Sequence, residues 1–224
     1  MEAYNKRVNQ RLIDYRFEFL LTALLFLIFD KILFPDNTIF LRYVWPVNMI
    51  LIAAACFGIF KERSKGVNTL KNIFSFISIL MPIGFLFLSR KLWFIELLTI
   101  FFILYYAFIF IEVMRQITKA REIRINVIIG SFCGYMILSL VALFSYLFIE
   151  LNFHGSFHGI TQNNISQVYN ELLYFSFITL TSIGFGDIYP ITDMSRLVVA
   201  FFGMAGQFYM VAVVGIIISR FASK

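Results

Sequence analysis

Charged residues are scarce in this sequence. Only 14% of its 224 residues are Asp, Glu, Lys or Arg, whereas 60% are hydrophobic and 29 are Phe. A soluble globule of this size needs far more polar surface than these residues supply. The composition therefore excludes an ordinary soluble domain and predicts a protein embedded in a lipid bilayer.

Cysteine and histidine are also rare. Cys56 and Cys133 each lie inside an apolar run, which favours buried or lipid-facing thiols over a disulfide. No cysteine–histidine cluster indicates a zinc site. An intramembrane enzyme would need paired acids or a Ser/His arrangement, but the acidic residues within the apolar part of the chain share no motif spacing. We therefore expect neither enzymatic activity nor an organic cofactor.

Six apolar runs have about the 20 residues needed to cross a bilayer as helices. They are Phe17–Phe34, Val44–Phe60, Ile73–Ser89, Leu92–Ile111, Val127–Ile149 and Leu197–Ser219. A seventh run, residues 168–180, is too short to span and leads directly into a glycine-containing stretch, which is typical of a re-entrant half-helix. The sequence thus predicts an all-α membrane protein with six transmembrane helices and one re-entrant helix.

The basic residues predict the orientation. With the N-terminus placed in the cytoplasm, 14 of the 19 Lys and Arg residues fall on the cytoplasmic side, as the positive-inside rule requires. Both termini are then cytoplasmic, and the glycine-containing stretch opens outside. The formal charge of +6 is thereby explained by topology, so we expect no nucleic-acid partner.

The chain divides into four predicted segments. Residues 1–16 form a cytoplasmic N-terminal segment, residues 17–111 a four-helix unit, and residues 127–224 a two-helix unit that contains the re-entrant helix. Residues 112–126 connect the two units. Their pattern fits either an amphipathic helix on the cytoplasmic membrane surface or a plain charged linker, and the sequence does not decide between them.

The glycine-containing stretch carries the main functional signal. Gly184 and Gly186 alternate with Ile183 and Phe185, and Asp187 ends the stretch. Glycine adopts backbone dihedrals that larger residues resist, so successive carbonyl oxygens can point to the same side. Carbonyl oxygens aimed at a common axis can replace the water shell of a cation. Ile183 and Phe185 are then expected to pack back into protein.

Residues 179–187, T-L-T-S-I-G-F-G-D, resemble the selectivity filter of potassium channels, usually T-x-T-T-V-G-Y-G-D. The resemblance implies that K+ ions bind in a filter formed by Ser182, Ile183, Gly184, Phe185 and Gly186. The chain departs from the usual filter at Ser182, Ile183 and Phe185. Phe185 lacks the phenol that braces many filters, which keeps a poorly selective cation channel as the alternative.

The resemblance extends to the helix before the filter. Glu171–Leu180 is similar to the pore helix of such channels, usually close to A-L-Y-F-S-F-V-T-L. It implies that Thr181, Tyr174 and Asp187 support the filter, with Tyr174 bracing Asp187; the alternative is a simple interfacial tyrosine. Ile178 stands where some relatives have a glutamate, so we expect no carboxylate pair behind this filter.

The last predicted span contains a further similarity. Gly203 and Gly206 precede Gln207-Phe-Tyr, which resembles the G-Q-x-Y of the inner helix in small bacterial six-span channels. The resemblance makes Gly206 a candidate gating hinge. Small residues in membranes also permit close helix contact, and both interpretations stay open.

His154 and His158 have the i, i+4 spacing of a metal site together with Glu150. Glycines at 155 and 159 break the helix that this spacing would require. A solvated outer loop is therefore the favoured interpretation.

Together these patterns predict a potassium-selective channel that conducts passively. One glycine loop cannot surround an ion, so the channel needs three further identical subunits. The resemblance places it in the cell membrane as a multi-pass protein in contact with lipid, and we expect a prokaryotic inner membrane. Residues 92–111 contain no basic residue, so strong voltage gating is not expected. A non-conducting regulatory subunit is a further alternative.

Overall fold

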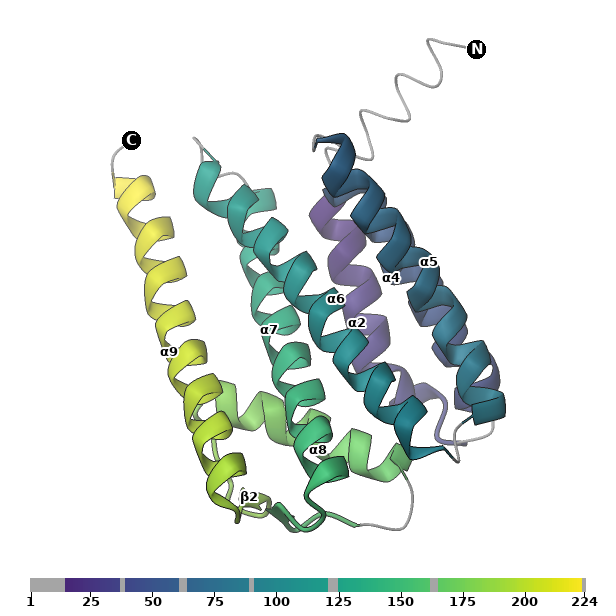
Figure 1. Ribbon diagram of the computed structural model, residues 1–224. Helices are drawn as coiled ribbons and strands as arrows, with labels where there is room; N and C mark the ends of the chain where they lie inside the picture. Colours follow the sequence, from purple (N-terminus) through teal and green to yellow (C-terminus); the bar gives the residue numbers. More distant parts are fainter. Residues whose placement is uncertain are drawn as a thin grey trace, which may run out of the picture. The chain divides into compact units, whose positions relative to one another are not determined.

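The computed structural model describes residues 15–36, 39–60, 64–88, 91–120, 125–161 and 165–222 (Figure 1). This part of the chain consists of helices, turns and two strands of two residues each. The elements are α2 (Arg16–Leu33), η1 (Phe40–Val44), α4 (Trp45–Ile59), α5 (Lys65–Leu88), α6 (Leu92–Lys119), α7 (Ile125–Asn152), β1 (Phe157–His158), α8 (Ile165–Leu180), β2 (Tyr189–Pro190) and α9 (Asp193–Ala222).

Four of the described helices are long and apolar enough to cross a membrane. They are α5, α6, α7 and α9, and they contain the third, fourth, fifth and sixth predicted spans. The prediction of an all-α membrane protein is therefore confirmed, whereas the number of six spans stays a prediction.

The first two predicted spans lie in α2 and α4, which are shorter or more polar. α2 has 18 residues, and four of them are charged. α4 has 15 residues, but the five-residue π-helical segment η1 runs directly into it. Membrane crossing by α2 and α4 stays a prediction.

The chain forms two compact units. The first contains Met1–Arg90 and Ile109–Gly134, and the second contains Lys91–Phe108 and Tyr135–Lys224. The sequence placed the boundary in the connection between the fourth and fifth spans. The structure places it inside α6 and α7 instead, because each of these 28-residue helices contributes one end to each unit.

The predicted connection 112–126 is not a separate element where it is described. Its first part continues α6 without a break as far as Lys119, and residues 121–124 lie outside the described residues. Buried Glu112 accepts hydrogen bonds from Arg115 at 2.6 and 3.0 Å and from Gln116 at 2.8 Å. Gln116 also donates to the Ile59 carbonyl oxygen at 2.7 Å. These bonds hold the end of α6 to α4 within the first unit.

An aromatic cluster positions the elements of the second unit. The ring of buried Tyr146, on α7, lies 5.7 Å from Phe157, 5.5 Å from Phe175 and 5.7 Å from Phe202, measured between centroids. These three rings belong to β1, α8 and α9. Tyr146 thereby fixes the short helix α8 between the two long helices of this unit.

Candidate functional site

The glycine loop (residues 181–187) follows α8, whose 16 residues are about 24 Å long and too short to cross a bilayer. The helix begins three residues before the predicted start and ends at the predicted residue, Leu180. Its buried side includes Leu172, Phe175 and Ile178. The absence of a carboxylate pair behind the loop stays a prediction.

The chain leaves α8 in a tight, hydrogen-bonded turn. The backbone N–H groups of Ile183 and Gly184 both donate to the carbonyl oxygen of Ile178, at 2.9 and 3.1 Å. The Thr181 hydroxyl donates to the Phe177 carbonyl oxygen at 2.7 Å. These bonds satisfy carbonyl groups that a helix C-terminus leaves free and fix the direction in which the loop starts.

Every second residue of the loop has a positive φ angle. The values are 60° at Ser182, 52° at Gly184 and 81° at Gly186. Glycine tolerates this conformation, whereas serine pays a steric cost, so Ser182 is held there by its surroundings. Ile183 and Phe185 were expected to pack into protein, but they are 56% and 71% exposed in the single chain.

Gln207 of α9 holds the side chain of Ser182. Its Nε2 group donates a hydrogen bond to the Ser182 hydroxyl oxygen. Both residues line an open hollow of about 570 Å³ together with Gly203, Met204 and Phe208. In the sequence Gln207 is recognisable only as part of G-Q-x-Y. Its contact with Ser182 spans 25 positions, and no local pattern predicts such a contact.

The outer end of the glycine loop packs against the loop that follows α7. β1 pairs antiparallel with β2, with Phe157 opposite Pro190 and His158 opposite Tyr189. Gly159 has a φ of +83°, and a Cβ atom there would collide with the carbonyl oxygen of Asp187. The sequence indicates only that Gly159 breaks a helix, since the contact with Asp187 depends on the fold.

Three buried or partly buried hydroxyl groups join the same loop to the start of α9. The Ser195 hydroxyl donates to the carbonyl oxygen of Ser156 at 2.9 Å, and the Thr192 hydroxyl lies 3.3 Å from that of Ser156. The Ile191 N–H also donates to the Ser156 carbonyl oxygen, at 2.8 Å. The backbone is therefore restrained immediately after the glycine loop.

Glu150 stabilises the outer loop through hydrogen bonds to its backbone. It is buried, and its carboxylate accepts the backbone N–H groups of Gly155 and Phe157 at 2.8 and 3.2 Å. His158 stacks on Tyr189, with 4.6 Å between ring centroids. Across the described residues no group of three or more His, Cys, Asp or Glu side chains could hold a metal ion.

Asp187 lies close enough to Tyr174 to affect its ionisation, and the brace itself stays a prediction. The pKa of Tyr174 is raised, first by desolvation and then by a hydrogen bond to Asp187 and by the negative charge of its carboxylate. Tyr174 itself is partly exposed. The pair therefore links the middle of α8 to the end of the glycine loop.

Gly206 lies at a close contact between α9 and α8. A Cβ atom at this position would approach the carbonyl oxygen of Leu180 to 3.0 Å and its Cβ to 3.1 Å. Gly203, by contrast, has open space around it. α9 continues through both glycines without a break. This geometry supports the packing interpretation of Gly206, while its role as a hinge stays a prediction.

Comparison with known proteins identifies the part of the chain that contains this loop. Residues 125–223 match the family model described as "Ion channel". No curated protein and no solved structure matches the chain. The matched residues run from the start of α7 to the end of α9 and include α8, the glycine loop and the outer loop. Residues 125–223 are therefore similar to the ion channel family over a little less than half of the chain.

Proposed function

We propose that four copies of this chain form a potassium-selective channel with the glycine loop as its filter. The observation that carries the proposal is the alternation of positive φ angles at residues 182, 184 and 186. This alternation allows the carbonyl oxygens of successive residues to face one axis. Backbone carbonyl oxygens at several adjacent sites select K+ and still release it quickly.

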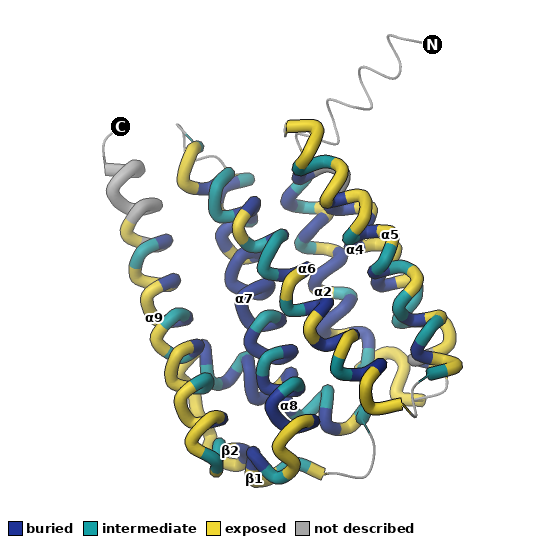
Figure 2. Tube along the Cα trace, in the orientation of Figure 1, coloured by how far each residue is buried: buried dark blue, intermediate teal, exposed yellow. Residues whose placement is uncertain are grey.

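One loop supplies oxygens on one side of an ion, so a complete filter requires several copies. The resemblance to potassium channels gives the number four, and two features of the single chain support association of copies. Ile183 and Phe185 are exposed, and a neighbouring copy would cover them. α9 also carries an exposed apolar stripe along one side (Figure 2). It consists of Leu197, Phe201, Met204, Phe208 and Val211, spaced at alternating intervals of four and three residues.

Within such a tetramer the residues take separate roles. The carbonyl oxygens of residues 182–185 and the Ser182 hydroxyl bind K+, with Gln207 orienting that hydroxyl. The hollow beside Ser182 becomes one quarter of a water-filled cavity below the filter. The C-terminal end of α8 adds partial negative charge, which stabilises a cation in the cavity. Gly186 forms the outer bend, and Asp187 adds negative charge at the mouth.

The proposed subunit crosses the membrane six times, with both ends in the cytoplasm. The charges of α2 lie at its two ends, at Arg16, Glu18, Asp30 and Lys31, and leave an uncharged centre. η1 and α4 together make a continuous stretch of about 30 Å, which is long enough to span.

Ion currents through purified protein in planar bilayers test this function. Reversal potentials in mixed K+ and Na+ should approach the K+ equilibrium potential. Equal permeability would favour a poorly selective cation channel. Absence of current from a correctly assembled protein would favour a regulatory subunit. Cross-linked species that stop at the dimer would contradict the pore itself.

A matched pair of variants distinguishes damage to the proposed filter from a general loss of stability. Gly184→Ala and Gly155→Ala each place a Cβ on a residue with positive φ, and both sites have open space around them. The backbone cost, about 1–2 kcal/mol, is therefore similar. Only Gly184→Ala should abolish K+ selectivity or current. Equal loss of current in both variants would argue against the proposed filter.

A further inference from the structure

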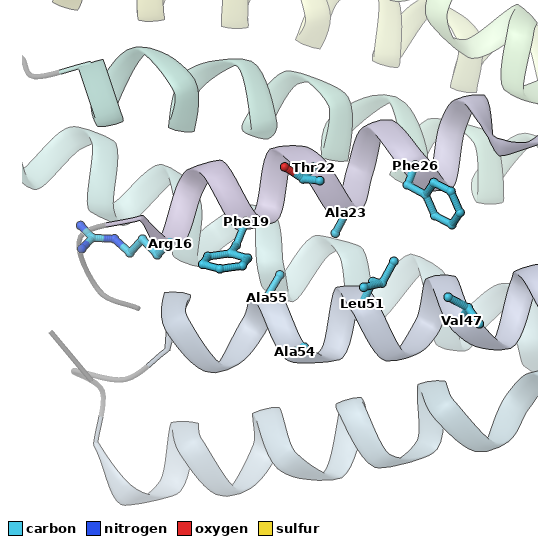
Figure 3. A pocket seen from close by; sticks show the side chains of 9 residues that line it. All are labelled: Arg16, Phe19, Thr22, Ala23, Phe26, Val47, Leu51, Ala54 and Ala55. Atoms are coloured by element: carbon cyan, nitrogen blue, oxygen red, sulfur yellow. The ribbon is translucent and has the colours of Figure 1, made fainter. Parts of the chain in front are cut away.

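A groove of about 480 Å³ runs between α2 and α4 of the first unit (Figure 3). Pockets that bind small molecules usually have about 300–1,000 Å³. Ala23 and Ala55 are buried at its base, and the exposed side chains of Phe19, Val47 and Leu51 form its walls. The groove is therefore lined mainly by apolar side chains, which suits a hydrocarbon chain.

The polar atoms of the groove lie at one end or are already bonded. The Thr22 hydroxyl donates to the Glu18 carbonyl oxygen at 2.8 Å, so it has no need of a polar ligand. Arg16 is the charged lining residue and lies at one end of the groove, whereas Phe26 and Val47 lie at the other. Its guanidinium group lies 5.0 Å from the centroid of the Phe17 ring, which helps to position it.

The length of the groove corresponds to one leaflet of a bilayer. The ten-residue separation from Arg16 to Phe26 rises by about 15 Å along α2. That is about half of the ~30 Å hydrocarbon thickness. With the proposed orientation, Arg16 lies at the cytoplasmic interface and the other end of the groove lies near the bilayer centre.

We propose that the groove binds an acyl chain of an anionic phospholipid from the cytoplasmic leaflet, with Arg16 bound to the phosphate. A guanidinium group has five N–H donors and can bind a phosphate in addition to protein groups. Lys65 at the start of α5 adds positive charge near the same interface, as expected for anionic lipid. This site belongs to the first unit and goes beyond ion conduction by the second.

Retained lipid is the direct test. The whole protein is equilibrated with vesicles of phosphatidylglycerol or phosphatidylcholine, solubilised and washed, and the phospholipid per subunit is counted by mass spectrometry. Wild type should retain phosphatidylglycerol in preference to phosphatidylcholine. Arg16→Gln should weaken phosphatidylglycerol binding about tenfold or more, as loss of a charge-assisted bond predicts. Lys65→Gln, outside the groove, should change it much less.

A second pair of variants tests the groove itself. Ala54→Phe places a ring in the groove, whereas Ile50→Phe places the same ring at an exposed position of α4 that does not line it. Ala54→Phe should lose the retained lipid, and Ile50→Phe should keep it. If Ala54→Phe does not fold, Thr22→Phe fills the groove from α2. Melting temperature and gel filtration identify the folded variants.

Several outcomes would overturn the proposal. These are no retained lipid on wild type, equal retention of both lipids, equal retention in the groove variants, and cross-linking of a second copy through the groove. Retention is measured without any current. Failure of the lipid site is therefore distinguishable from failure of the channel.

Discussion

Gly159 packs against the carbonyl oxygen of Asp187 with no space for a side chain between them. The contact joins the loop after α7 to the outer end of the glycine loop. Together with the β1–β2 pairing it restrains the backbone at the point where the proposed filter opens to the outside. A substitution that displaces the backbone of this outer loop should therefore also displace the backbone of the proposed filter.

Gly159→Ala should destabilise the filter more than Gly155→Ala does. Both glycines have positive φ angles, +83° and +77°, so each alanine has a backbone cost of about 1–2 kcal/mol. Only alanine at 159 also collides with Asp187. We expect a lower melting temperature and faster loss of K+ current during sustained opening for Gly159→Ala. Identical behaviour of the two variants would mean that the contact with Asp187 does not support the filter.

Gln207→Leu should reduce K+ selectivity or conductance. Leucine has a similar size but cannot donate to Ser182, which would then lose the bond that orients its hydroxyl. Met204→Leu is the control, because Met204 lines the same hollow and its thioether has no hydrogen to donate to Ser182. Reversal potentials and single-channel conductance measure the effect. If both variants match wild type, the Ser182 hydroxyl does not depend on Gln207.

Much of the helical architecture follows from local sequence. The third to sixth apolar runs predict α5, α6, α7 and α9, because about 20 apolar residues in a bilayer must form a helix. The short run before the glycines likewise predicts α8. The extension of α6 to Lys119 was missed. It depends on the bond from Gln116 to Ile59, which lies 57 positions away in the chain.

The supports of the glycine loop were harder to predict than the loop itself. Gly184 and Gly186 are visible in the sequence because their spacing is local. The contacts of Gln207 with Ser182 and of Gly159 with Asp187 depend on how α7, α8 and α9 pack. Glu150 is a similar case. Its spacing from His154 and His158 does not predict that its carboxylate accepts the backbone N–H groups of Gly155 and Phe157, because these bonds depend on how the outer loop folds back.

Tyr174→Phe should accelerate the loss of current during sustained opening. The change removes the hydroxyl that bonds to Asp187 and leaves the ring in place. Tyr43→Phe, an exposed tyrosine of η1 in the first unit, is the control. If the loss of current follows the same time course in Tyr174→Phe as in wild type, Tyr174 is a simple interfacial tyrosine and does not brace Asp187.

The same bond predicts an effect of alkaline pH. Because the pKa of Tyr174 is raised in the folded protein, its stabilising contribution is complete below the ordinary tyrosine pKa of about 10. It is lost as the pH rises through the higher pKa of the folded state. Wild-type current should therefore become less stable above about pH 10, and Tyr174→Phe should lack this component of the pH dependence. Parallel pH profiles of the two proteins would contradict the brace.

The channel should respond only weakly to voltage. One charge that crosses the whole membrane field gains about 2.3 kcal/mol per 100 mV, and steep gating needs roughly 3–4 such charges in each of four subunits. The apolar part of α6, residues 92–111, contains Glu96 and no basic residue. Glu96 lies near one end of the helix and can cross only a small part of the field.

The basic residues at the other end of α6 do not supply the missing charge. Arg115 forms an ion pair with buried Glu112, so the two would move together with no net charge. Lys119 is the last residue of the helix, at the proposed cytoplasmic surface. Each charge that crosses the whole field would gain about 2.3 kcal/mol per 100 mV, and α6 supplies almost none. Open probability should therefore change little between about −100 and +100 mV. A steep sigmoidal activation curve with measurable gating current would show that charges outside α6 sense voltage.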